Sequence, residues 1–222
     1  MKRGKAFGAF GLLALGFFLA ALGLWKQGPL WGDLSVTLFL QGLLGTEPFW
    51  AFWVTDSAKF PMVLGLLLPA LLWAWMLAGV QGLGTVGASF LLAKAIDPVL
   101  RALIYAPKPT EDLVPVAVHS SSSGLPSTFA FVYGSIFAAL ILLQASGRAQ
   151  GSRLSLWISG LLLLVLLMAC LSRVVLAGHW SSQMLASLMV ISALTFFVHK
   201  AIGSVPWLKR PRKDPSPTHR LC

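Results

Sequence analysis

The chain has 222 residues, of which 57% are hydrophobic and only 11% are charged. Soluble domains carry about 25% charged residues, so this composition excludes an ordinary soluble enzyme and predicts an integral membrane protein of one domain. The formal net charge is +10, but the basic residues gather at the ends of apolar segments and in one tail. That distribution is typical of membrane topology, so no nucleic acid is expected as a partner.

The apolar segments predict an all-α fold, a polytopic membrane bundle with six transmembrane helices. A helix needs about 20 mostly apolar residues to cross a bilayer. The first segment follows a basic N-terminus, which is also typical of a cleaved signal peptide. Its apolar run is longer than the roughly 7–15 residues of a signal sequence, which favours an uncleaved helix. The six predicted spans are Ala6–Trp25, Phe60–Val80, Leu83–Ile104, Ser127–Gln144, Leu154–Leu171 and Trp180–Lys200.

Residues 30–57 separate the first two spans and are not predicted to cross the membrane. The segment is apolar and aromatic, but glycines and prolines interrupt it, and it carries Trp31, Trp50 and Trp53. Because tryptophan prefers the level of the lipid headgroups, we expect interfacial helices on the outer side.

The distribution of basic residues predicts the orientation. With the N-terminus inside, most of the 17 lysines and arginines fall on the inner side, which indicates an N-in, C-in topology. Residues 1–201 then form the membrane domain. Residues 202–222 form a basic cytoplasmic tail that we expect to be disordered and attracted to anionic inner-leaflet lipid. In a bacterium with two membranes, this is an inner-membrane protein whose outer face lies in the periplasm.

The third predicted span carries three charged residues, Lys94, Asp97 and Arg101. Their spacings of three and four place them on one face of a helix. A charged stripe inside a span is expected to face a polar cavity rather than lipid. An ion pair between Lys94 and Asp97 with a purely structural role is the alternative interpretation.

The following outer loop and the start of the fourth span offer further polar groups. His119 begins a run of serines, and Ser127 and Thr128 stand where the fourth span begins. The free N–H groups at a helix N-terminus bind anions, although Ser and Thr are also ordinary caps. The two roles are compatible at this position.

The segment between the last two spans contains Arg173, His179 and Gln183. A lone Arg and a lone His at the mouth of a membrane bundle are costly unless they are paired or hydrated. Arg can bind a phosphate with two hydrogen bonds, and His can attack one. Gln183 shares a helical face with His179, so its carbonyl could accept a hydrogen bond from one imidazole nitrogen and leave the other as a nucleophile. The alternative for His179 is an interfacial residue beside Trp180.

These three groups of residues resemble the type-2 phosphatidic acid phosphatase superfamily, which includes membrane lipid phosphatases. The family pattern is Lys-x6-Arg-Pro, then Pro-Ser-Gly-His, then Ser-Arg-x5-His-x3-Asp. The matching positions are Lys94 and Arg101, without the Pro; Pro126 and Ser127, with Thr128 and Phe129 replacing Gly and His; and Ser172, Arg173 and His179, with Gln183 replacing Asp.

The resemblance implies a phosphatase or phosphotransferase that acts on a phosphorylated lipid at the outer face. It implies that His179 attacks phosphorus and forms a phosphohistidine, and that neither a metal nor another cofactor is required. The residues implied to bind phosphate are Lys94, Arg101, Ser127, Thr128 and Arg173.

Two departures from the family pattern affect the chemistry. In the family, the His of the second motif protonates the leaving oxygen and the final Asp charges the nucleophile. Phe129 and Gln183 can do neither. The leaving group of a lipid diphosphate, such as polyprenyl diphosphate, does not need to be protonated, because it is a phosphate monoester with a second pKa of about 6. His119 is an alternative proton donor.

Two other functions remain open at this point. A catalytically inactive descendant would keep the cations and bind phosphorylated lipid, or act as a subunit of a complex. A small transporter would show internal repeats, which the sequence lacks.

Overall fold

The computed structural model describes residues 2–146 and 152–205, and within these residues it is all-helical. Five helices, α1, α5, α6, α7 and α8, are long and apolar enough to cross a membrane, which indicates an integral membrane protein. The helices are α1 Lys2–Lys26, α2 Asp33–Leu44, α3 Phe49–Asp56, α4 Val63–Ala78, α5 Val80–Leu103, α6 Thr128–Ser146, α7 Arg153–Val175 and α8 Ser181–Ser204.

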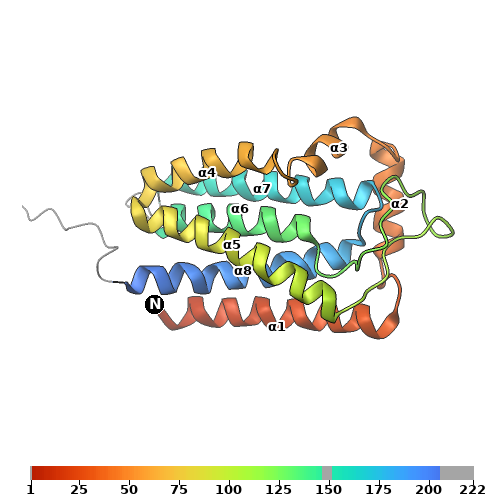
Figure 1. The fold of residues 1–222 in the computed structure, drawn as a ribbon, viewed down its shortest axis with the longest axis horizontal. Helices are drawn as coiled ribbons and strands as arrows, with labels where there is room; N and C mark the ends of the chain where they lie inside the picture. Colours follow the sequence, from red (N-terminus) through yellow and green to blue (C-terminus); the bar gives the residue numbers. More distant parts are fainter. Residues whose placement is uncertain (1, 147–151, 206–222) are drawn as a thin grey trace, which may run out of the picture.

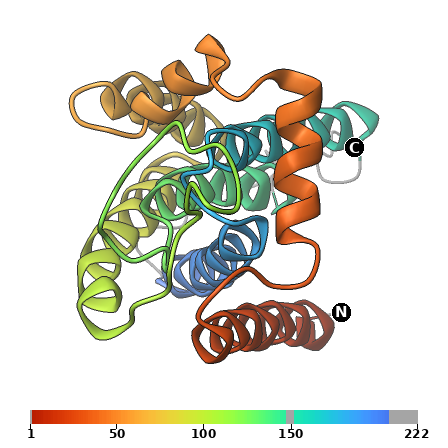
Figure 2. The same cartoon turned by 90° about the vertical axis from the view of Figure 1, so that its right-hand side faces the viewer.

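The long helices run side by side, and α2 lies across one end of the bundle (Figure 1). The loop of residues 104–127 covers the same end, which we call the capped end (Figure 2). The N-terminus and the end of α8 lie at the opposite end (Figure 1).

Helix α6 forms the centre of the bundle. In its apolar window 72% of the residues are buried, against 33% or less in the other four candidate spans. Helices α4, α5, α7 and α8 all pack against it. A helix that is apolar all round is buried among its neighbours. The N-terminal end of α6 is therefore held in a fixed position at the capped end.

The second predicted span is shorter than expected. Helix α4 has 16 residues, about 24 Å at 1.5 Å per residue, whereas the hydrocarbon core is about 30 Å thick. It ends at Gly79, which has a φ of 62°, and α5 begins at the next residue. A Cβ on Gly82 would lie 1.9 Å from the carbonyl oxygen of Ala74, so this abrupt reversal requires glycine. The turn therefore occupies the end of the predicted span Phe60–Val80, and α4 stops at Ala78.

Residues 30–57 form two helices at the capped end, α2 and α3 (Figure 2). Gln41 of α2 donates from its amide nitrogen to the carbonyl oxygens of Pro115, at 2.8 Å, and Val175, at 2.9 Å. Helix α2 therefore ties the loop of residues 104–127 to the end of α7.

The boundary between the predicted membrane domain and the tail is displaced slightly. Helix α8 continues through the predicted boundary at residue 201 to Ser204. Most of the predicted tail, residues 206–222, lies outside the described residues.

Candidate active site

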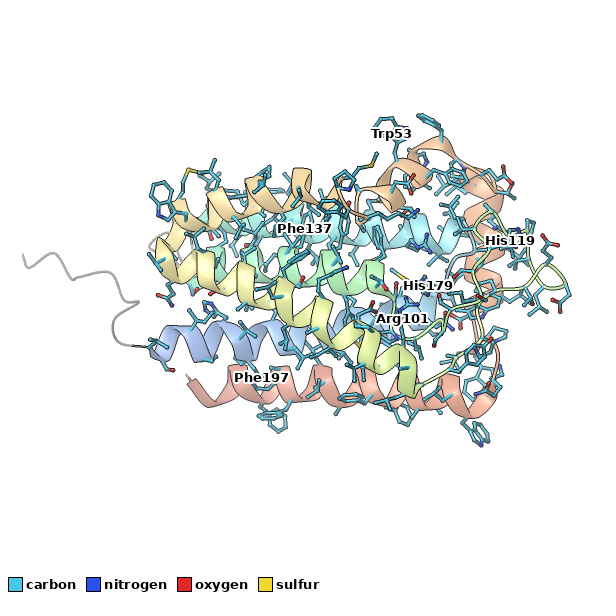
Figure 3. All side chains as sticks on the ribbon, viewed as in Figure 1. Trp53, Arg101, His119, Phe137, His179 and Phe197 are labelled. Carbon is cyan, nitrogen blue, oxygen red and sulfur yellow. The ribbon has the colours of Figure 1, made fainter. Side chains whose placement is uncertain are left out.

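A cavity of about 350 Å³ opens at the capped end. It is formed by the C-terminal ends of α3, α5 and α7, the N-terminal end of α6 and the loop of residues 104–127. Two histidines line it, and they lie at this end of the bundle in Figure 3 together with Arg101. No carboxylate is among its described lining residues. The charged or titratable residues that line it are Lys59, Arg101, Lys108, His119, Arg173 and His179.

His179 is the only one of these side chains that can act as a neutral nucleophile from a buried position. It is 2% exposed, and its Nδ1 lies 3.0 Å from the carbonyl oxygen of Gly124. Because a carbonyl only accepts, Nδ1 carries the proton and Nε2 keeps its lone pair. Burial holds the pKa of His179 well below its usual range, and the nearby Arg173, Lys108 and Arg101 lower it further. The imidazole is therefore neutral at neutral pH.

Gln183 has different partners from those predicted. Its amide oxygen accepts from the backbone N–H of Trp180 at 3.2 Å, and its amide nitrogen donates to the carbonyl of Pro107 at 2.8 Å. It therefore caps α8 instead of orienting His179, and the carbonyl of Gly124 takes the orienting role. A Cβ on Gly124 would lie 2.5 Å from the amide of Gln183, so a larger residue at this position would require the Gln183 side chain to move.

Asp33 of α2 holds the start of α8 and was not anticipated from the sequence. It is 2% exposed. Its carboxylate accepts from the hydroxyls of Ser181 and Ser182, each at 2.6 Å, and from the Ser182 N–H at 2.8 Å. A carboxylate at a helix N-terminus satisfies free N–H groups and complements the helix dipole. Asp33 thus fixes the segment that immediately follows His179.

Arg173 points into the cavity with unused hydrogen-bonding capacity. It is 8% exposed, and its Nη1 donates to Thr55 at 3.4 Å. Its Nε has no hydrogen-bond partner among the described residues. A Cβ on Gly178 would lie 2.5 Å from the Arg173 guanidinium, so this glycine leaves the space that the side chain occupies. A buried cation with a free donor favours an anionic ligand.

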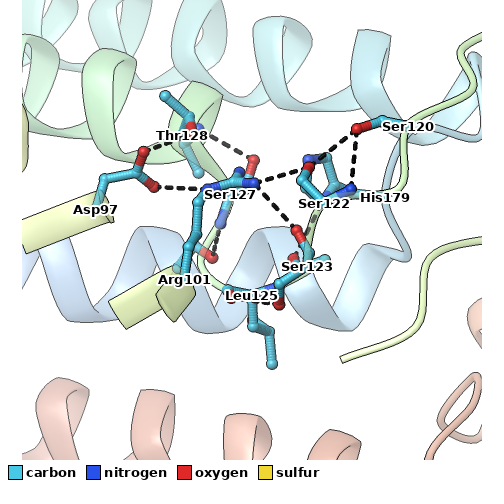
Figure 4. Close-up of polar contacts among 12 residues, drawn as sticks. Asp97, Arg101, Ser120, Ser122, Ser123, Leu125, Ser127, Thr128 and His179 are labelled. Carbon is cyan, nitrogen blue, oxygen red and sulfur yellow. Dashed lines mark hydrogen bonds and ion pairs between the residues drawn. The ribbon is translucent and has the colours of Figure 1, made fainter. Parts of the chain in front are cut away.

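Asp97 links α5 to α6 beside the cavity (Figure 4). It accepts from Arg101 Nε at 3.1 Å and from the Thr128 hydroxyl at 2.7 Å. The predicted alternative partner, Lys94, is exposed on α5 and does not line the cavity. Lys94 stands seven residues, about 10 Å, further from the capped end than Arg101, and this distance explains why it does not reach the cavity.

The hydroxyl of Ser122 accepts hydrogen bonds from two cations, of which Arg101 is labelled in Figure 4. Arg101 Nη1 and Lys108 Nζ each donate to its oxygen at 2.9 Å, and the Ser120 hydroxyl lies at the same distance. Cationic donors converging on one oxygen are what a phosphate oxygen requires. Ser122 therefore occupies a position suited to an anion.

Ser122 should compete with a bound anion. We expect Ser122→Ala to tighten binding of inorganic phosphate about fivefold, because the anion no longer displaces a hydrogen-bonded hydroxyl worth about 1 kcal/mol. Isothermal titration calorimetry of the detergent-solubilised protein measures this, with Ser121→Ala as the matched control. Weaker binding by Ser122→Ala would instead make the hydroxyl a ligand of the anion.

Lys108 is the cation that the sequence analysis missed. It takes the place beside Arg101 that was predicted for Lys94. A signal was present, because Arg101, Lys108 and Pro109 reproduce the spacing Lys-x6-Arg-Pro with the two basic residues exchanged. Burial lowers the pKa of Lys108 to about 8, and the charges of Arg101 and Arg173 contribute to this shift.

The lowered pKa of Lys108 predicts a pH dependence. Anion binding by the free protein should weaken as the pH rises through about 8, because Lys108 loses its charge there. kcat/KM should fall over this range. As the pH is lowered to 6.5, kcat/KM should stay constant, because the pKa of His179 is well below its usual range and the imidazole stays neutral. Lys108→Arg should abolish the alkaline decline, which pH profiles of the two proteins would show. An unchanged decline in the variant would assign it to another group.

The remaining predicted site residues lie in three different positions. Ser127 is fully buried; its N–H donates to Ser187 at 2.9 Å and its hydroxyl accepts from Ala130 N–H at 3.4 Å. It therefore caps α6 and does not line the cavity. Thr128 lines the cavity, but its hydroxyl is donated to Asp97. His119 lies at the rim, largely exposed, with Nε2 3.5 Å from Glu111.

No protein-family model, curated protein or solved structure matches the chain. Its function is therefore inferred from the geometry of the cavity and from the sequence motifs that resemble the phosphatase superfamily.

Proposed function

We propose that the protein is a membrane phosphatase or phosphotransferase that acts on a phosphorylated lipid through a phosphohistidine on His179. The observation that carries the proposal is the lone pair of His179 Nε2 in a cavity lined by four cationic side chains. Preorganised cations stabilise the charge of a transferring phosphoryl group. A neutral imidazole needs no further base before it attacks.

We infer that α4 is a sixth, short span and that the topology is N-in, C-in in a bacterial inner membrane. Two observations support this: the N-terminus and the end of α8 share one end of the bundle (Figure 1), and the sequence is rich in lysine and arginine near both chain ends. The cavity at the opposite end then opens to the periplasm. A short span is accommodated by local thinning of the bilayer. The basic tail would contact anionic inner-leaflet lipid.

The residues of the cavity favour a lipid diphosphate, such as a polyprenyl diphosphate, as substrate. Phe129 lines the cavity at the position where the superfamily has its proton-donating His. An alkoxide that leaves from a phosphatidate requires a proton. A lipid monophosphate that leaves from a diphosphate does not, because its second pKa is about 6.

Phosphate release tests the proposal. The detergent-solubilised protein would be given undecaprenyl diphosphate and phosphatidate in parallel, with His179→Ala as the control. The expected result is release from the diphosphate that disappears in the variant. Faster release from phosphatidate would contradict the leaving-group argument.

A protein that only binds phosphorylated lipid is the second candidate. The partner of His179 Nδ1 favours it, because the backbone carbonyl of Gly124 raises the nucleophilicity of the imidazole less than a carboxylate would. Binding of either lipid without any release of phosphate would select this function.

A further inference from the structure

The linker between α3 and α4 adds a fourth cation to the cavity, on a different wall from Arg101 and Lys108. Lys59 lines the cavity together with Thr55 and Ala58. Arg101 and Lys108 converge on Ser122 from the end of α5 and the following loop. The cations thus come from both sides of the cavity.

Four cations exceed what one phosphate group requires. A transferred phosphoryl group presents three non-bridging oxygens, and Arg101, Lys108 and Arg173 can each bind one. The cavity volume of about 350 Å³ has room for roughly ten groups of the size of water. Space and charge therefore remain beyond a single phosphate.

Lys59 is placed where a phosphate next to a lipid chain would lie. The residues that follow it are apolar and exposed: Phe60 is 81% exposed and Met62 is 54% exposed. They lead directly into α4, whose apolar surface faces the bilayer in the topology proposed above. A lipid chain attached to a phosphate at Lys59 could therefore continue over these residues into the membrane.

We propose that Lys59 forms a second phosphate subsite, which binds the lipid-proximal phosphate of a lipid diphosphate while Arg101, Lys108 and Arg173 bind the terminal one. This inference rests on the function proposed above and specifies its substrate. His179 Nε2 forms a bond to the terminal phosphorus as the bond from that phosphorus to the bridging oxygen breaks. The electron pair stays on the bridging oxygen of the departing lipid monophosphate, where Lys59 stabilises the charge.

Asp56 restrains Lys59 in the absence of a ligand. Its carboxylate lies 2.6 Å from Lys59 Nζ, and both side chains are largely exposed. The pair can therefore open at little cost, because exposed ion pairs contribute less than about 1 kcal/mol. Removing the Asp56 charge should free Lys59 for the second phosphate.

The test compares two non-hydrolysable probes, methylphosphonate and methylenediphosphonate, by isothermal titration calorimetry of the detergent-solubilised full chain. Lys59→Met should weaken binding of the diphosphonate about tenfold, as expected for a charge-assisted hydrogen bond, and leave the monophosphonate within twofold. Asp56→Asn should tighten binding of the diphosphonate more than that of the monophosphonate, because the Asp56 charge acts on Arg173 as well as on Lys59. Lys26→Met, at the end of α1, is the matched control and should change neither.

The outcomes separate the subsite from the proposed function. Equal effects of Lys59→Met on the two probes, or none on either, would overturn the subsite even if His179-dependent release of phosphate persists. Failure of the wild-type protein to bind either probe, together with no release from undecaprenyl diphosphate, would overturn both proposals.

Discussion

Replacing His179 with Gln should lower the rate of phosphoryl transfer by at least about 10⁴-fold, the scale on which loss of a nucleophile acts in other enzymes. Glutamine keeps a donor near the Gly124 carbonyl, which His179 Nδ1 contacts at 3.0 Å. It has no nucleophilic nitrogen. The rate should therefore collapse, whereas binding of inorganic phosphate stays within a few-fold of wild type because the cations remain.

Rates of phosphate release and calorimetric phosphate affinities, measured on the same preparations, separate these two effects. A His179→Gln protein that still turns over at a tenth of the wild-type rate would show that the nucleophile is a different group. A variant that loses phosphate binding as well would indicate that His179 holds the cavity together.

Arg173→Met should have opposite effects on activity and stability. Arg173 is 8% exposed and its Nε has no partner among the described residues, so the folded protein retains a poorly compensated cation. Methionine removes that cost with a side chain of similar length, and replacing buried charges with apolar groups is often neutral or stabilising. We expect an unchanged or higher melting temperature in detergent.

Activity should fall by roughly 10³-fold or more, because an arginine that contacts a transferring phosphoryl group contributes about that much. Arg173→Lys should retain only part of the activity, since a lysine cannot form the bidentate contact. Thermal unfolding and phosphate-release assays measure the two effects. A large loss of stability in Arg173→Met would assign the residue a structural role instead.

The balance of charge explains why these effects should be separable. Asp97 neutralises Arg101 and anchors it to α6 through Thr128, whereas the Arg173 guanidinium donates, among the described residues, only to Thr55 at 3.4 Å. Arg101 is therefore part of the framework, and Arg173 is held ready for a ligand. Unsatisfied groups of this kind are typical of sites where function is maintained at the expense of stability.

The fold could be predicted where a local pattern determines it. Long apolar runs predicted the five helices that have the length of a membrane span, because hydrophobicity acts within one segment. The length of α4 could not be predicted in this way. It depends on the close approach of Gly82 to Ala74, a contact between two helices that periodicity does not report.

Residues of the candidate site could be predicted when their position along a single segment was enough to place them at the end of the bundle. Arg101, Arg173 and His179 were expected at one end of the bundle, and the structure brings them together around one cavity. Asp33 was missed because its role arises from contacts with Ser181 and Ser182, almost 150 residues further along the chain. Lys108 was missed although its spacing from Arg101 was a signal in the sequence. Gln183 was given a wrong partner, since Gly124 approaches His179 from a loop 55 residues away.

Trapping the phosphoenzyme would show whether His179 is the nucleophile. The solubilised protein would be mixed with undecaprenyl diphosphate that carries ³²P in its terminal phosphate, and the reaction would be stopped in alkali. We expect a label that resists base, is released by acid and maps to the peptide containing His179, and no label in His179→Gln. Turnover of the lipid without labelled protein, or with the label on another residue, would contradict this role of His179.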